Sequence, residues 1–315
     1  MPTKVTVARL HHHGEPLRVE EEPLADPGPG EVRVELAFGG VNPIDRYAAV
    51  GRFAADGPLP RVLGSEASGT VGGRPVVVHG HGLGRRRDGV WASAANVPAG
   101  ATVAVPDGVG LPEAAAVGVA GVTAWRTVHE VAGVTSEDRV LVLGAAGGVG
   151  TMILSAVRAL GALAWGQTGD PGKVGALLAA GADRAVVSDG PGLLEATVGL
   201  APTVVFDPLG GSFTGAAVEA LEPRGRLVLF GTSAGPTGEV PLQVLYRKAL
   251  RLLTFSGTIE PDEVMAAGIS AALGGLAAGT LRVTVDEVLP LAAVNEALAR
   301  LEGPGRVGKI LLRLS

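Results

Sequence analysis

Apolar and polar positions follow one periodicity in the first third of the chain and another in the rest. Up to about residue 105, short runs rich in Val, Leu and Thr are separated by Gly, Pro and Asp, which is typical of strands joined by turns. We therefore expect an all-β, barrel-like half. The expected strands span residues 4–8, 17–21, 31–39, 67–71, 74–78 and 102–105.

Near Leu111 the rhythm changes, and short apolar runs alternate with Ala-rich segments of helical period. This alternation is the βαβ signature of a parallel sheet, and six strands complete a doubly wound one. The expected strands span residues 139–143, 163–165, 184–187, 203–206, 226–230 and 252–255, with helices over 149–160, 173–180, 193–198 and 213–221.

The tail is expected to return to the β half. Its pattern predicts a helix over 262–279, a strand over 282–288, a helix over 291–301 and a final strand over 309–314. The sequence thus predicts an α/β protein of two domains. A doubly wound Rossmann domain over residues 112–255 is inserted into a β-barrel domain built from residues 1–111 and 256–315.

Composition narrows the classes of function. Of 315 residues, 47% are apolar and 18% charged, and the 49 glycines and 22 prolines follow no three-residue period, so the chain is neither disordered nor fibrous. The formal net charge of −5 argues against a nucleic-acid footprint or a polybasic membrane anchor, because both need concentrated positive charge. We expect neither nucleic acid nor membrane as a partner.

The chain has no cysteine, which excludes disulfides, a thiolate nucleophile and zinc sites that contain Cys. Residues 1–10 lack the continuous apolar core of a signal peptide, so we expect a cytoplasmic protein. Residues 140–157 and 264–281 are uncharged, but four glycines interrupt each stretch. We interpret neither as a membrane span.

A glycine-rich turn carries the clearest functional signal. An apolar strand ends at Leu143 and is followed by a turn and a predicted helix, with the residues Gly144, Ala145, Ala146, Gly147, Gly148, Val149 and Gly150. Ala145 takes the first place of the G-x-G-x-x-G pattern. Glycines let the backbone approach a pyrophosphate, and the start of the helix supplies unpaired N–H groups. The turn predicts a dinucleotide-binding site.

The end of the next strand indicates which dinucleotide binds. NAD sites place an Asp or Glu there, about twenty residues after the turn, whereas this chain has Trp-Gly-Gln-Thr at 165–168. Gly169, Asp170 and Lys173 follow. Lys173 can pair with a 2′-phosphate, although Asp170 opposes it by repulsion. We expect NADPH in preference to NADH.

Seven motifs spread over nearly the whole chain resemble the medium-chain dehydrogenase/reductase superfamily and, within it, the zinc-free quinone oxidoreductase-like branch. The resemblance implies a GroES-like β domain made from both chain ends, with a Rossmann domain between them. Besides the glycine turn, the motifs are PGEV (29–32), GVNPIDRY (40–47), LGSEASG (63–69), AAAVGVAGVTAW (114–125), DPLGG (207–211), GRLVLFG (225–231) and GKILL (308–312).

Zinc-using relatives hold catalytic metal with two Cys and one His, and the matching positions here are Asn42, Ser65 and about Val119. An amide, a hydroxyl and an alkyl group do not make a zinc site. The segment 74–91 is also too short for the four-Cys lobe that holds structural zinc. We expect no metal.

The resemblance implies reduction of a quinone, a 2-alkenal, an enone or an enoyl thioester with NADPH. Hydride addition to a conjugated C=C needs only hydrogen-bond donors at the carbonyl oxygen and a later proton. Asn42 and Tyr47 are the expected catalytic residues, Asn42 also lying near the nicotinamide. Arg46, Phe53 and Phe255 are expected in the substrate pocket, and Thr123, Phe230, Gly231 and Thr232 beside the cofactor.

Several alternatives stay open. Asn42 can instead shape a turn, Tyr47 can pack in the core, and the carboxylates of Asp45 and Glu66 are expected to make structural hydrogen bonds. A zinc-free carbonyl reductase or a biosynthetic oxidoreductase or cyclase fits the same residues. A protein of another class, a dinucleotide-binding sensor without turnover, fits the turn alone.

The strand 252–255 is expected at an edge of the parallel sheet. Neither Pro nor a charge interrupts it, so its unpaired N–H and C=O groups can pair with a second copy. We expect a homodimer joined through this strand. The alternative is an edge covered by the chain's own tail.

Overall fold

The chain forms two compact units. The computed structural model describes residues 3–52 and 57–315. The first unit comprises Met1–Val122, Glu260–Ala278 and Val285–Ser315, and the second comprises Thr123–Ile259 and Gly279–Thr284. Residues 112–122 thus join the first unit, which differs from the expected boundary. The Val119 N–H donates to the Glu66 carboxylate there.

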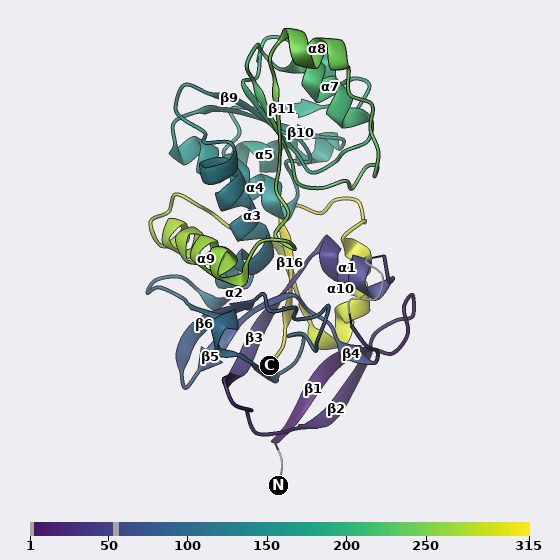
Figure 1. The fold of residues 1–315 in the computed structure, drawn as a ribbon, viewed down its shortest axis with the longest axis vertical. Helices are drawn as coiled ribbons and strands as arrows, with labels where there is room; N and C mark the ends of the chain where they lie inside the picture. The colour runs from purple at the N-terminus through teal and green to yellow at the C-terminus, as the bar shows by residue number, and fades with distance from the viewer. Residues whose placement is uncertain (1–2, 53–56) are drawn as a thin grey trace. The chain divides into compact units, whose positions relative to one another are not determined.

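Two sheets form the first unit (Figure 1). The smaller has the order β2 (Arg18–Leu24), β1 (Thr3–Leu10), β4 (Arg61–Val62). The larger has the order β15 (Val285–Pro290), β16 (Lys309–Arg313), β3 (Glu31–Val41), β5 (Glu66–Val71), β6 (Arg74–His79), β8 (Thr102–Ala104), with β7 (Ala94–Pro98) also paired to β3. Neighbouring strands run antiparallel except β15 and β16, which are parallel.

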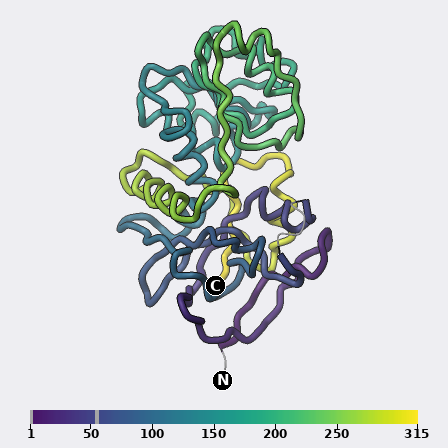
Figure 2. The backbone as a smooth tube through the Cα atoms, viewed as in Figure 1, coloured from purple at the N-terminus to yellow at the C-terminus, as the bar shows by residue number. Residues whose placement is uncertain are grey.

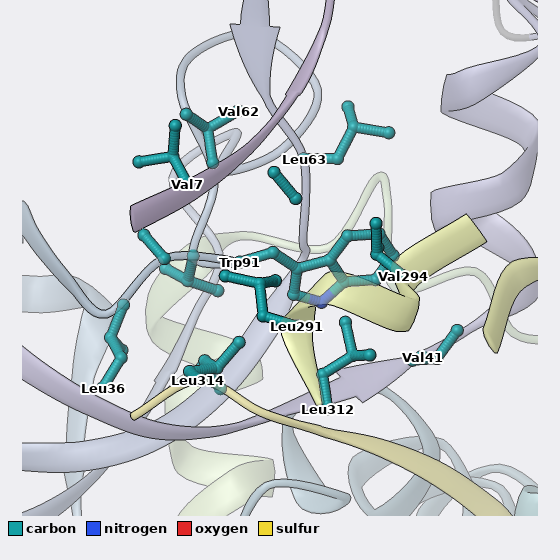
Figure 3. Packing of buried hydrophobic residues seen from close by; sticks show 14 of the residues in the cluster. Val7, Leu36, Val41, Val62, Leu63, Trp91, Leu291, Val294, Leu312 and Leu314 are labelled. Carbon is teal, nitrogen blue, oxygen red and sulfur yellow. The ribbon is translucent and has the colours of Figure 1, made fainter. Parts of the chain in front are cut away.

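Both ends of the chain meet in this unit, as the sequence predicted. The C-terminal strand β16 pairs with β3, and the yellow C-terminal segment runs beside the purple N-terminal strands (Figure 2). Trp91 lies fully buried at the centre of the shared core. Figure 3 shows it among Leu291 and Leu312 from the tail and Leu63 from the N-terminal part. The tail is thus part of the core of the β unit.

Short helices complete the first unit. The N-terminal helix α1 was not expected from the sequence, because its seven residues are too few to show a helical period, although Pro43 at its start is a typical first helical residue. The helices are α1 (Pro43–Ala49), α2 (Leu111–Ala114), α9 (Asp262–Ala277) and α10 (Val294–Arg300), with 3₁₀ turns η1 (Ala99–Ala101) and η5 (Leu291–Ala293) and a π-helical turn η2 (Val117–Gly121).

The second unit is the predicted doubly wound sheet. Its six strands are parallel, with the order β11 (Arg184–Val187), β10 (Leu163–Thr168), β9 (Arg139–Val142), β12 (Val204–Asp207), β13 (Arg226–Leu229), β14 (Arg251–Thr254). This is the strand order 3-2-1-4-5-6 of a Rossmann fold. The mixed α/β architecture predicted from the sequence is confirmed.

Helices connect these strands. Helices α4 and α5 pack on β9 to β11, and α7 packs on β12 (Figure 1). Exposed α8 was not predicted; it carries Leu242 and Tyr246 at the surface. The segments are α3 (Val122–Arg126), η3 (Thr127–Val131), α4 (Gly148–Ala159), η4 (Pro171–Lys173), α5 (Val174–Ala180), α6 (Leu193–Ala196), α7 (Ser212–Ala220) and α8 (Leu242–Arg247).

The two uncharged stretches are parts of these folded units. Residues 140–157 divide into strand β9, the glycine turn and helix α4, and residues 264–281 lie mostly in helix α9. Over residues 3–52 and 57–315, we find no helix with the length and apolar character to cross a membrane.

We predict a homodimer that pairs through β14, the edge strand of the parallel sheet, which begins one residue earlier than expected, at the exposed and charged Arg251. Leu252 on this strand is 44% exposed. A lysine there puts a charge on the open edge, so Leu252→Lys should convert the dimer to a monomer in static light scattering. Val198→Lys, at another exposed apolar position of the same unit, should remain dimeric. A monomeric mass for the wild type at micromolar concentration would contradict the prediction.

Candidate active site

Gln167, at the end of β10, holds the glycine turn in place. Its side-chain Oε1 accepts the Gly144 N–H at 2.9 Å, and its backbone carbonyl accepts the Ala145 N–H at 2.9 Å. Its Nε2 donates to the Ser188 carbonyl at 2.6 Å. The turn after β9 is therefore fixed to the ends of the next two strands. The sequence analysis noted Gln167 only as a non-acidic residue and missed this role, which a long-range contact creates.

The start of α4 presents backbone donors. We find no acceptor among the described residues for the N–H groups of Ala146, Gly148, Val149 and Gly150. Unpaired N–H groups at a helix N-terminus, together with the positive end of the helix dipole, fit an anion such as a pyrophosphate.

Glycine at position 150 is needed for this geometry. A Cβ there would lie 2.7 Å from the Ala145 Cα, so a side chain would push the helix away from the turn. By contrast, the N–H groups of Gly144, Ala145 and Gly147 donate within the protein. These three residues shape the turn, and the residues at 146 and 148–150 present the donors.

Gly169, Asp170 and Lys173 follow β10 at the same carboxyl edge of the sheet. The Asp170 carboxylate accepts the Gly172 N–H at 2.9 Å. The Lys173 Nζ lies 4.0 Å from that carboxylate. The charge of the ammonium group is thus partly balanced by Asp170.

The segment after β13 reaches the same edge. The Phe230 N–H donates to the Asp207 carbonyl at 3.0 Å. A Cβ on Gly231 would lie 2.6 Å from the Pro208 carbonyl oxygen, so these two connections run close together. The structure therefore brings the predicted cofactor residues 144–150, 169–173 and 230–232 to one edge of the sheet, where ligands bind in open α/β folds.

Two other predicted residues of this unit belong to other segments, and one of them, Phe255, is at the same carboxyl edge. Thr123 lies in α3, where its carbonyl accepts the Thr127 hydroxyl at 2.7 Å. Phe255 directly follows β14 and is buried, with the Arg126 guanidinium 5.3 Å from its ring centroid.

In the first unit, Asn42 lies in a buried polar network. The Lys309 Nζ on β16 donates to Asn42 Oδ1 at 2.7 Å, to Glu66 Oε1 at 2.7 Å and to the Val41 carbonyl at 3.3 Å. Asn42 Nδ2 donates to Glu66 Oε1 at 2.7 Å. Lys309 is 3% exposed and Glu66 is 0% exposed. Lys309 was part of the motif GKILL, but its contact with Asn42 was not predicted, because 267 residues separate the two.

Glu66 links this network to the π-helical turn η2. Its Oε2 accepts the Val119 N–H at 2.7 Å. Glycine at position 40 leaves room for the carboxylate, since a Cβ there would lie 2.1 Å from Glu66 Oε1. The carboxylate of Glu66 thus makes structural hydrogen bonds, as the sequence analysis expected.

Asp45 acts in the same way one turn into α1. Its two oxygens accept the Asn42 N–H and the Ser65 N–H, each at 2.9 Å. Burial raises the pKa of Asp45 from 3.8 to about 6, with the nearby Glu66 charge adding to the rise. The carboxyl fixes the backbone on both sides of the network.

His79 borders the network as a neutral imidazole. Burial lowers its pKa below 6.5. Its Nδ1 lies 3.0 Å from the Ser65 carbonyl, and a carbonyl only accepts, so Nδ1 carries the proton.

The remaining predicted residues of this unit belong to or follow α1. The Arg52 guanidinium lies 5.0 Å from the centroid of the Tyr47 ring. Arg46 forms an ion pair with Glu302, which follows α10. Phe53 lies outside the described residues.

Comparisons with known proteins agree with this architecture. Residues 180–312 match the family model described as zinc-binding dehydrogenase. Quinone oxidoreductase from Salmonella typhimurium is 30% identical over 297 residues, which cover 90% of each chain. Quinone oxidoreductase 1 from Escherichia coli is 29% identical and covers 98% of this chain and 99% of its own. The chain belongs to the medium-chain dehydrogenase/reductase superfamily, in its quinone oxidoreductase branch.

A solved structure of this superfamily shows the same fold. Mycobacterial Rv1454c complexed with NADPH superposes with a TM-score of 0.86 at 28% identity, covering 98% of this chain and 99% of that chain. The resemblance found in the sequence motifs is thereby confirmed, and this dehydrogenase/reductase is an oxidoreductase by family.

The zinc named by the family model does not fit the residues of this dehydrogenase/reductase. At the matching positions, the oxygen of Asn42 already accepts from the Lys309 ammonium. Ser65 supplies a hydroxyl and Val119 an alkyl side chain, and zinc prefers sulfur and imidazole ligands. A cation beside Asn42 also repels a metal ion. We therefore derive no chemistry through zinc.

Asp45 gives a testable pH dependence. The folded protein holds its proton up to about pH 6, whereas the unfolded chain releases it near 3.8. The carboxyl therefore contributes stability that is fully present below pH 3.8 and is lost as the pH rises through 6. The difference in pKa corresponds to about 3 kcal/mol of unfolding free energy.

Asp45→Asn cannot titrate, so its stability lacks this dependence. The melting temperature of the wild type minus that of the variant should decrease between about pH 4 and about pH 7. A constant difference across that range would show that the pKa of Asp45 is not raised.

Proposed function

We propose that this oxidoreductase is a zinc-independent, NADPH-dependent reductase of a quinone or of the activated C=C of an enone, 2-alkenal or enoyl thioester. The observation that carries the proposal is the buried amide of Asn42. By the resemblance it matches a position where zinc-using relatives hold metal, and after one N–H donates to Glu66 we find no acceptor for the other within residues 3–52 and 57–315. A neutral hydrogen-bond donor thus takes the place of a Lewis acid.

The cofactor proposal rests on the second unit. The donors at 146 and 148–150 fit a pyrophosphate, and the mycobacterial relative was solved with NADPH. Lys173 is the candidate partner of the 2′-phosphate. Thr123 and residues 230–232 are proposed to contact the nicotinamide half of the cofactor.

The proposed reaction requires little from the protein besides hydrogen-bond donors. NADPH supplies a hydride. When a hydride adds to a conjugated C=C or to a quinone, negative charge develops on a carbonyl oxygen, and hydrogen bonds to that oxygen stabilise the transition state. Asn42 is proposed to donate one such bond and the Tyr47 hydroxyl a second bond or the proton. Arg46 of α1 is proposed to contact the substrate.

Turnover tests the proposal directly. The purified protein should oxidise NADPH when a quinone, an enone or an enoyl thioester is added. The absorbance of NADPH measures the rate. Asn42→Ala should lower kcat about a hundredfold, the cost of one oxyanion donor, and leave the Kd for NADPH nearly unchanged. Tight NADPH binding without turnover across the panel would favour the sensor instead.

Lys173 tests the cofactor preference. Lys173→Ala should raise the Kd for NADPH about tenfold, since one charge-assisted bond is worth roughly 1.4 kcal/mol, and leave the Kd for NADH nearly unchanged. Lys173→Arg keeps the charge and should keep the preference. Equal losses for both cofactors would remove Lys173 from the 2′-phosphate site.

A further inference from the structure

Two charged groups of opposite hydrogen-bonding character hold the amide of Asn42. The ammonium of Lys309 only donates, and it lies 2.7 Å from Asn42 Oδ1. The carboxylate of Glu66 only accepts when ionised, and it lies 2.7 Å from Asn42 Nδ2. Rotating the amide by half a turn would place its oxygen against Glu66 and its NH₂ against Lys309. The network therefore permits a single orientation.

The same network leaves one donor over. The three N–H groups of Lys309 go to Asn42, Glu66 and the Val41 carbonyl. The second oxygen of Glu66 takes the Val119 N–H. One N–H of Asn42 Nδ2 donates to Glu66, and for the other we find no acceptor in the part of the chain that the structure describes. That N–H has a fixed position.

We infer that Lys309 is a positioning residue for the reaction, acting through Asn42 to hold this remaining N–H toward the carbonyl oxygen of the substrate. The inference rests on the proposed function. The ammonium also polarises the amide through its bond to Oδ1, which strengthens the opposite N–H as a donor. Glu66 balances the buried positive charge, without which a lysine in this position is costly.

A purely structural role is the alternative. Lys309 belongs to the last strand and Glu66 to β5, so their ion pair also connects the tail to the centre of the sheet. However, replacing a buried ion pair as a unit is often neutral for stability. The two roles therefore differ in what happens when both charges are removed together.

The test is the double variant Glu66→Gln/Lys309→Met. It removes both charges, so no unpaired ion stays buried. A glutamine at 66 can pair with either orientation of the Asn42 amide, so the orientation is no longer specified. We expect a folded protein whose Kd for NADPH changes less than about twofold and whose kcat with a quinone falls about tenfold, as for other residues that orient a reacting group.

A mutant cycle separates positioning from structure. In the Asn42→Ala background, the same double change should lower kcat no further, because it acts only through the amide. Lys309→Arg keeps a donor and should recover most of kcat. Arg313→Met, which removes an exposed cation from the same strand, should leave kcat unchanged.

Three results would overturn the inference. One is a folded double variant whose kcat equals that of the wild type. Another is a double change that lowers kcat in the Asn42→Ala background by the same factor as in the wild-type background. If the double variant unfolds, Glu66→Gln/Lys309→Gln, which also removes both charges and leaves the orientation of the Asn42 amide unspecified, takes its place with the same expectations. The third result is a wild type that turns over no acceptor, which overturns the proposed function as well. If the wild type turns over an acceptor and the double variant has the same kcat, only the inference is overturned.

Discussion

The buried contact between Lys309 and Glu66 constrains the local packing where the last strand meets the centre of the sheet in the first unit. The two residues come from opposite parts of the chain, and their side chains meet at 2.7 Å with almost no exposure. Such a pair is tolerated only where every remaining donor and acceptor is satisfied. The strand β16 must therefore lie beside β3, and position 40 must be glycine, because any Cβ there would collide with the carboxylate. The fully buried Trp91 extends the same constraint, since its core includes Leu312 and Leu314 from the tail.

The second unit applies a comparable constraint with a neutral side chain. The Gln167 amide joins the glycine turn to the end of β11, and its backbone carbonyl takes a further turn N–H. Donors that are bonded within the protein cannot bind a ligand, so this contact decides which N–H groups stay available. In both units a buried amide side chain has defined hydrogen-bond partners. A small number of nearby N–H groups then have no acceptor among the described residues. Preorganised donors of this kind need no rearrangement when charge develops on a ligand.

Local pattern predicted most of the fold. Alternation predicted β1 to β3, β5, β6 and β8, and the βαβ alternation predicted all six parallel strands, because these signals depend on neighbouring residues. The local pattern missed β4 and β7. Strand β4 has only two residues. Strand β7 begins with Ala-Ala-Asn, which has little strand propensity, and it is a strand because it pairs with β3. In the candidate site, motifs indicated Asn42 and the glycine turn. Gln167 and Lys309 were given no role, although Lys309 is part of the motif GKILL, because a polar residue at a strand end or in a tail strand does not show by local pattern what it contacts. Their partners are known only after the chain has folded.

The donor set also explains how a fold whose family model is described as zinc-binding can be compatible with chemistry that needs no metal. The carboxylates of Asp45 and Glu66 accept backbone N–H groups from Asn42, Ser65 and Val119. The resemblance matches Asn42, Ser65 and about Val119 to the positions at which zinc-using relatives hold metal. The backbone around the site is therefore held by the carboxylates, independently of what the three side chains can bind. With that backbone fixed, an amide at position 42 is enough to convert a metal-ligand position into a hydrogen-bond donor. A quinone or a conjugated carbonyl needs only such a donor, because hydride addition delocalises its charge onto oxygen.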